Sequence, residues 1–177
     1  MTITAQASPH RPARAGGPGA PRRSAAAGLL AALLALPLIA AAADAPARSR
    51  GQRIYVPAYS HILIGDRSTP FNLAATLSVR NTDPAAAATV TAIDYHDGSG
   101  RLVKRHLARP HVLQPLASTE VFVPESDTSG GFGASFLVTW TAETAITPPV
   151  VECLLIGARS GQGISILSPG RVIEQTP

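Results

Sequence analysis

Hydrophobic and polar side chains alternate most regularly between Phe71 and Asn81. Apolar residues occupy every second position from Phe71 to Val79, and the positions between them are mostly small or polar. A period of two sustained over this length, followed by the turn-forming Asp83 and Pro84, is typical of a β-strand with one buried face. This segment therefore predicts a strand that lies on a hydrophobic core.

Shorter runs separated by glycine and proline predict further strands. No segment has the period of a convincing helix, and the runs recur at a spacing of roughly ten residues, as in all-β sandwiches. We therefore expect an all-β, immunoglobulin-like sandwich of two sheets with about seven to eight strands. The predicted strands besides the central one are Ile54 to Tyr59, 89–96, 101–105, 118–123, 134–141, 150–156 and 164–167.

Local signals refine the placement of individual strands. Pro57 has no backbone donor, which predicts a sheet edge or a bulge for the first strand. Asp97-Gly98-Ser99-Gly100 predicts a hairpin in which Tyr95 faces Leu102. The run 150–156 is apolar on both parities apart from Glu152, which predicts a central strand covered on two sides.

Two connections also carry signals. The segment 112–117, with Pro115 at a corner, resembles the point where an immunoglobulin-like chain passes from one sheet to the other. The polar, glycine-rich segment 125–133 predicts a loop in which one or more glycines adopt positive φ.

The N-terminal segment has the composition of an export signal. Four arginines without any acidic residue precede nineteen uncharged residues, Ala25 to Ala43, which end in three alanines. We interpret 1–43 as a secretory signal peptide cleaved before Asp44, with an uncleaved N-terminal membrane anchor as the alternative. The predicted division continues with a flexible linker at 44–53, a β-sandwich domain at 54–173 and a tail at 174–177. The predicted location is the periplasm of a Gram-negative bacterium.

Charge and cysteine content limit the classes of function. Four of the fifteen basic residues precede Asp44, so eleven remain to balance the eleven acidic residues that follow it. A neutral domain argues against a nucleic-acid partner, because phosphate binding depends on excess Lys and Arg. The single cysteine, Cys153, excludes an internal disulfide and is expected to be a small buried apolar residue.

Several segments together resemble a known family. They are YVPAYSHI, LSVRNTD, ESDTSGGFGASFLVTW, PPVVE and GQGIS, which occur in this order between Tyr55 and Ser165. This chain resembles, over Gly51 to Ile173, a family of exported bacterial proteins catalogued as domain of unknown function 3124. The resemblance implies no assigned chemistry. Ser135, where the family pattern suggests asparagine, and Cys153, where it suggests a small apolar residue, are departures.

The candidate binding residues are polar side chains in otherwise apolar or glycine-rich surroundings. A ligand-contacting edge of aromatic residues competes with a simple packing role under a loop, and a structural ion pair between Arg80 and Glu152 competes with a binding pocket. Ser60 and His61 are adjacent on a strand and point to opposite faces, which disfavours nucleophilic catalysis. The candidates are Tyr55, Tyr59, His61, Arg80, Asp127 and Glu152.

Metal binding and cofactors are not expected. Asp94 and His96 share one strand face, but Arg101 and Arg105 on the paired strand would repel a cation. An outer ladder of Asp and Arg pairs is the preferred interpretation.

The predicted function is a non-catalytic binding or envelope-assembly module. Its partner would be an envelope protein or a small ligand, and it would contact the membrane only through an uncleaved leader. The alternative is a small hydrolase or metal-dependent enzyme, which would require His61, Asp66 and Asp127 to converge.

Overall fold

The computed structural model describes residues 47–159 and 161–176. The predicted signal peptide and its cleavage point lie outside these residues. The described segments belong to one compact unit, Asp44–Pro177. They contain no helix long and apolar enough to cross a membrane.

The described residues form twelve strands and no helix, which confirms the all-β prediction but exceeds the predicted seven to eight strands. The additional strands are mostly short pieces and flanks that carry little hydrophobic signal. The strands are β1 (Ser49–Pro57), β2 (His61–Ile64), β3 (Thr69–Asn72), β4 (Ala74–Arg80), β5 (Ala88–His96), β6 (Leu102–Arg105), β7 (His111–Leu113), β8 (Ser118–Val123), β9 (Ser135–Ile146), β10 (Val150–Arg159), β11 (Gln162–Pro169) and β12 (Arg171–Thr176).

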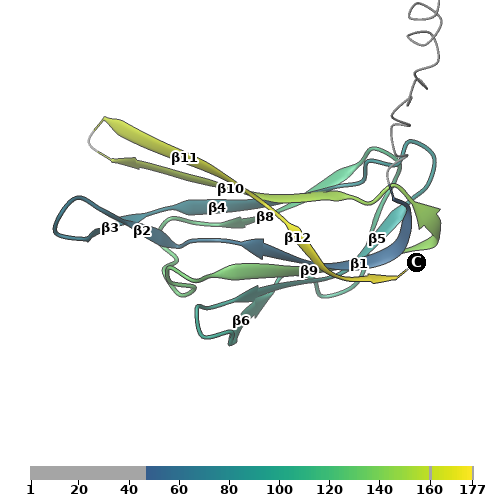
Figure 1. The fold of residues 1–177 in the computed structure, drawn as a ribbon, viewed down its shortest axis with the longest axis horizontal. Coiled ribbons are helices and arrows are strands. Elements are labelled where there is room, and N and C mark those ends of the chain that lie inside the picture. The colour runs from purple at the N-terminus through teal and green to yellow at the C-terminus, as the bar shows by residue number, and fades with distance from the viewer. Residues whose placement is uncertain (1–46, 160, 177) are drawn as a thin grey trace, which may run out of the picture. The chain divides into compact units, whose positions relative to one another are not determined.

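Two sheets face each other, and a hairpin extends beyond them (Figure 1). The first sheet has six strands in the order β12-β1-β9-β5-β6, with β7 also paired to β5. The second sheet has four strands in the order β11-β10-β4-β8, and β2 pairs only with β3. The chain leaves the first sheet after β7 and enters the second at β8, which confirms the predicted change of sheet around Pro115.

The core lies between the two sheets. The predicted alternation is confirmed, because Phe71, Leu73, Ala75, Leu77 and Val79 are all buried. They pack with apolar side chains from the first sheet, among them Val138 and Trp140. The predicted single strand is nevertheless split at Leu73, whose N–H donates to the carbonyl of Ser60 at 2.9 Å. The split allows β3 to join the hairpin while β4 joins the second sheet.

The segments predicted as linker and tail pair with each other. Residues 49–53 form the first half of β1, and 174–176 form the end of β12, with Gly51 opposite Thr176. Gln52 is buried, and its side-chain oxygen accepts a hydrogen bond from the indole nitrogen of Trp140 at 3.3 Å. The absence of an apolar period here misled the sequence interpretation, because a polar residue takes the inward position.

Strand β1 is central, since it lies between β12 and β9. The prediction of an edge strand was therefore wrong for most of its length. Pairing with β12 ends at Tyr55, so Pro57 pairs only with Ser135 of β9. The alternative prediction, a bulge at Pro57, was also wrong: pairing with β9 is regular from Gly51 to Pro57, and the register shift between Arg53 and Ile54 leaves the extra residue, Ile173, on β12.

The β5–β6 hairpin forms with a different register. His96 pairs with Leu102 because Arg101 belongs to the turn, and Tyr95 pairs with Lys104 because the register shifts again at Val103. Leu102 is consequently exposed, and the predicted Tyr95–Leu102 pairing was wrong. Asp94 still reaches Arg105 at 3.8 Å, which agrees with a ladder of Asp and Arg pairs on the outer face.

Strand β10 is covered on one side only among the described residues. Val151, Cys153 and Leu155 point into the core, whereas Val150, Leu154 and Ile156 are exposed. The prediction of a strand covered on two sides was wrong because apolar residues also occupy its outer face. Burial raises the pKa of the Cys153 thiol to about 12, as expected for a core residue.

A buried polar network joins the turns at the end of the sandwich where β1 begins. The carboxylate of Asp83 accepts hydrogen bonds from the N–H groups of Thr147 at 2.9 Å, Ala85 at 2.9 Å and Ala86 at 3.0 Å. Arg48 reaches the same carboxylate at 3.3 Å. The Thr147 N–H foremost, with the others, holds the pKa of Asp83 below its usual value.

This network predicts a specific loss of stability in acid. A lowered carboxyl pKa stabilises the fold above the unfolded pKa of about 4, and this contribution disappears as pH falls through the folded value. Asp83→Asn should therefore lower the melting temperature at pH 7, and the difference from the wild type should narrow below about pH 4. Thermal melts across pH 3 to 7 test this, with Asp66→Asn in an exposed turn as control. A difference independent of pH would contradict it.

Candidate functional site

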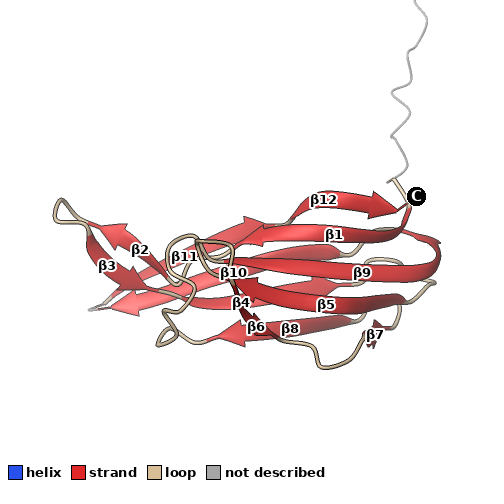
Figure 2. Ribbon diagram, turned by 90° about the horizontal axis from the view of Figure 1, so that it is seen from below, coloured by secondary structure: helices blue, strands red, loops and turns tan. Residues whose placement is uncertain are grey.

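The candidate site lies at the end of the sandwich where β1 finishes, opposite the end where Ser49 begins that strand (Figure 2). We call it the loop end, and it comprises the β2–β3 hairpin with the preceding residues 58–60, the 124–134 loop, and Arg159 at the end of β10. Backbone hydrogen bonds hold these parts together. The Ala58 N–H donates to Ala134 O at 2.8 Å, and the Ser60 N–H donates to Gly131 O at 3.0 Å.

The buried side chain of Tyr95 packs against the inner side of the loop end. Its hydroxyl lies 3.1 Å from the Ser60 hydroxyl in a buried hydrogen bond, and its ring packs on Phe136 with centroids 4.9 Å apart. Burial raises the pKa of Tyr95, so its hydroxyl stays neutral and available to hydrogen-bond. Gly130 lies directly against this ring, where there is no room for a Cβ. The 124–134 loop is therefore seated on a rigid base.

An aromatic patch formed by Tyr59, His61 and Phe132 occupies the surface of the loop end. The rings of Tyr59 and Phe132 meet edge to face with centroids 5.3 Å apart, and the His61 ring lies 6.5 Å from that of Phe132. Phe132 remains 55% exposed, although it is fixed between glycines in a loop with Gly131 at positive φ. The patch thus presents a large apolar ring to solvent on an ordered support.

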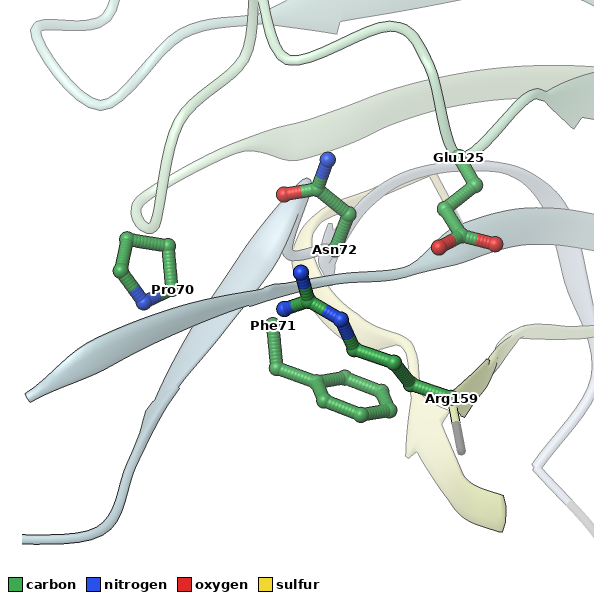
Figure 3. Close-up of a pocket in the computed structure, with 5 residues that line it drawn as sticks. All are labelled: Pro70, Phe71, Asn72, Glu125 and Arg159. Carbon is green, nitrogen blue, oxygen red and sulfur yellow. The ribbon is translucent and has the colours of Figure 1, made fainter. Parts of the chain in front are cut away.

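A pocket of about 250 Å³ lies beside the aromatic patch. It is lined by Pro70, Phe71, Asn72, Glu125 and Arg159 (Figure 3). His61 and Asn72 are direct partners in the β2–β3 ladder, so their side chains lie on the same face of the hairpin. The pocket and the aromatic patch are therefore neighbours.

Asp127 belongs to the loop end, but its carboxylate serves the loop itself. Its Oδ1 accepts hydrogen bonds from the Ser129 N–H at 3.0 Å and from the Ser129 hydroxyl at 2.5 Å. The Ser129 hydroxyl foremost lowers the pKa of Asp127, which keeps the carboxylate ionised. Asp127 thus shapes the turn that precedes Gly130.

The structure separates the other predicted site residues from this end. Tyr55 is 40% exposed on the outer face of the first sheet, between Leu137 and Arg171. Arg80 and Glu152 lie on the outer face of the second sheet, and no salt bridge joins them among the described residues. Arg80 instead donates to the Ser78 hydroxyl at 3.0 Å.

Two of the three residues of the alternative, enzymatic interpretation lie apart along the β2–β3 hairpin. His61 opens β2, whereas Asp66 lies in the turn beyond Ile64, roughly 10 Å or more along the strand. Within the part of the chain that the structure describes, no group of three His, Cys, Asp or Glu side chains could hold a metal ion.

His106 is a partly buried residue whose Nε2 atom is shielded from solvent. Within the described part of the chain this Nε2 has no hydrogen-bond partner, and the His106 ring centroid lies 6.0 Å from that of Phe136. Burial lowers the pKa of His106, which favours the neutral imidazole. Through its contact with Phe136, His106 belongs to the group of side chains that pack beneath the loop end.

Other loop-end residues were missed because their roles depend on tertiary contacts. Phe132 was included in the expected glycine-rich loop, and its exposure beside Tyr59 follows from how that loop folds back. Asn72 was expected in a continuous strand, and Glu125 and Arg159 carry no local motif.

Comparisons with known proteins give a family and a solved structure with limited similarity. A family model described as a protein of unknown function (DUF3124) matches residues 51–173. The search of curated proteins finds no match to this chain. A solved structure, described as the crystal structure of Thermotoga maritima 1070, is similar with a TM-score of 0.44 and 13% sequence identity. The match covers 71% of this chain and 97% of that one.

Proposed function

The chain belongs to the DUF3124 family of proteins of unknown function, and from this premise we propose that it is a non-catalytic binding module whose contact surface is the loop end. The partner is a protein of the cell envelope. Binding would centre on the aromatic patch, with the hairpin and the 124–134 loop as its surround.

The exposure of Phe132 carries this proposal. An aromatic ring that is 55% exposed loses apolar contact with solvent when a partner covers it, at about 25 cal/mol per Å² of buried apolar area. Tyr59 holds the ring in place, so little side-chain entropy is lost on binding. Aromatic residues fixed in this manner are typical of the energetic centres of protein interfaces.

The expected export of the chain fits this arrangement. A leader that is cleaved would release the domain, and a leader that stays as an anchor would join it near Ser49. The loop end lies at the other end of β1. In either case the aromatic patch would be free to contact a partner outside the cytoplasm.

A matched pair of phenylalanines tests the proposal. Phe132 and Phe122 are both exposed, but Phe122 lies on the outer face of the second sheet, on strand β8. The protein is purified from cells expressing the full chain and immobilised, and the amount of partner protein that it retains from an envelope extract is measured. Phe132→Ala should reduce retention at least tenfold, as for an interface hot spot, whereas Phe122→Ala should leave it unchanged. Equal retention by the wild type and Phe132→Ala would contradict the proposal.

A further inference from the structure

The pocket beside the aromatic patch contains two opposite charges from different parts of the chain. Arg159 comes from the end of β10, and Glu125 follows β8 in the 124–134 loop. Figure 3 shows the Arg159 guanidinium group beside Asn72 and Phe71, with the Glu125 carboxylate at another side of the pocket. Pro70 and Phe71 supply apolar wall, and Asn72 supplies an amide.

These two charges do not neutralise each other. Among the described residues, the salt bridges are those of Arg48, Arg53, Arg101 and Arg105, and neither Glu125 nor Arg159 takes part in one. No side-chain hydrogen bond of Arg159 to another described residue is present either. The pocket therefore keeps a positive and a negative group apart around a space of about 250 Å³.

Separated opposite charges select for a ligand that carries both. A simple anion would be attracted by Arg159 but repelled by Glu125. A simple cation would be attracted by Glu125 but repelled by Arg159. A guanidinium group binds a carboxylate through two parallel N–H donors, and a carboxylate accepts from an ammonium group. The volume lies just below the range of drug-sized pockets, so the pocket has room for a ligand smaller than a typical drug.

We propose that this pocket binds a small zwitterion of the α-amino-acid class. The ligand carboxylate contacts Arg159, its ammonium group contacts Glu125, and a short side chain lies against Pro70 and Phe71. Asn72 offers an amide that can donate to the carboxylate or accept from the ammonium group. This inference rests on the proposed binding role of the loop end and adds a small-molecule ligand to it.

Isothermal titration calorimetry with glycine, alanine and serine tests the inference. The protein is purified from cells expressing the full chain, and acetate and methylammonium serve as probes that each carry half of the zwitterion. Binding of at least one amino acid is expected, at least tenfold tighter than either half-probe. Arg159→Gln and Glu125→Gln should each weaken that binding about tenfold or more, because each leaves one charge of the ligand without its partner.

Two matched variants separate a local effect from a change in net charge. Arg109→Gln and Glu120→Gln remove the same charges at exposed positions outside the pocket, and they should leave binding unchanged. No binding of any of the three amino acids at millimolar concentration would overturn the inference, as would acetate binding as tightly as the best of them. If no amino acid binds but the protein still retains a partner through Phe132, the inference about the pocket is wrong and the proposed function is unaffected.

Discussion

An Asn81→Ala substitution is expected to lower the free energy of unfolding by about 3 kcal/mol, the cost of leaving several buried polar groups without partners. The side chain of Asn81 is buried and donates from Nδ2 to the carbonyls of Ala86 at 2.8 Å, Gln114 at 3.0 Å and Leu113 at 3.2 Å. Its oxygen accepts from the Asp83 N–H at 3.1 Å. Alanine removes all of these bonds and supplies no replacement.

Urea unfolding followed by the fluorescence of Trp140, the single tryptophan, measures this loss. The neighbouring Arg80→Ala is the control, because Arg80 is exposed and its side chain, among the described residues, donates a single hydrogen bond, to the Ser78 hydroxyl. It should change the free energy of unfolding by about 0.5 kcal/mol or less. A comparable loss in both variants would show that Asn81 does not have the special role assigned to it.

Gly130→Ala is expected to destabilise the protein by about 2 kcal/mol or more through overpacking. A Cβ at this position would collide with the Tyr95 ring and hydroxyl and with the Cβ of Ala134. Because Tyr95 is buried and hydrogen-bonded to Ser60, the tyrosine has no space into which it could retreat. The 124–134 loop must then shift, so binding through Phe132 should weaken together with stability.

Gly163→Ala provides the matched control for this substitution. A Cβ at Gly163 would meet no atom within 4 Å, and its φ is not in the left-handed region. Thermal melts and partner retention should therefore both stay close to the wild type for Gly163→Ala. Adding Tyr95→Phe to Gly130→Ala should recover part of the lost stability by removing one colliding atom. Failure of Gly130→Ala to change either measurement would contradict the seating of the loop on Tyr95.

The parity of apolar residues predicted which side chains build the core, because burial of one strand face imposes a period of two. The buried positions of β4 and of Phe136, Val138 and Trp140 follow this rule without exception. Strand ends were less predictable. Gln52 takes an inward position through its hydrogen bond with Trp140, and no sequence period signals such a contact.

Hairpin register and the cover of sheet faces also depended on tertiary structure. The turn residues Asp97 to Gly100 predicted the β5–β6 hairpin, but the inclusion of Arg101 in the turn and a register shift at Val103 moved its pairing. Strand β10 has apolar residues on its exposed outer face as well as its buried face, so its sequence has the pattern of a strand covered on both sides. A sequence contains no direct record of which face a neighbouring sheet occupies.

The candidate site could be predicted only in part. Tyr59, His61 and Asp127 do gather at the loop end, but Arg80 and Glu152 lie on the outer face of the second sheet. Their proposed ion pair rested on elimination alone, and its absence follows from the partly open environment of Glu152. Arg159 and Glu125 are far apart in sequence, and only the folded chain brings both to one pocket.

Site-specific photo-cross-linking tests most directly the claim that the loop end is the contact surface. A photoreactive phenylalanine is placed at either position 132 or position 122 of the full chain, and cells producing each variant are irradiated. A discrete adduct with an envelope protein should form from position 132 and not from position 122. An adduct from position 122 with none from position 132 would contradict the account and move the contact surface to the outer face of the second sheet.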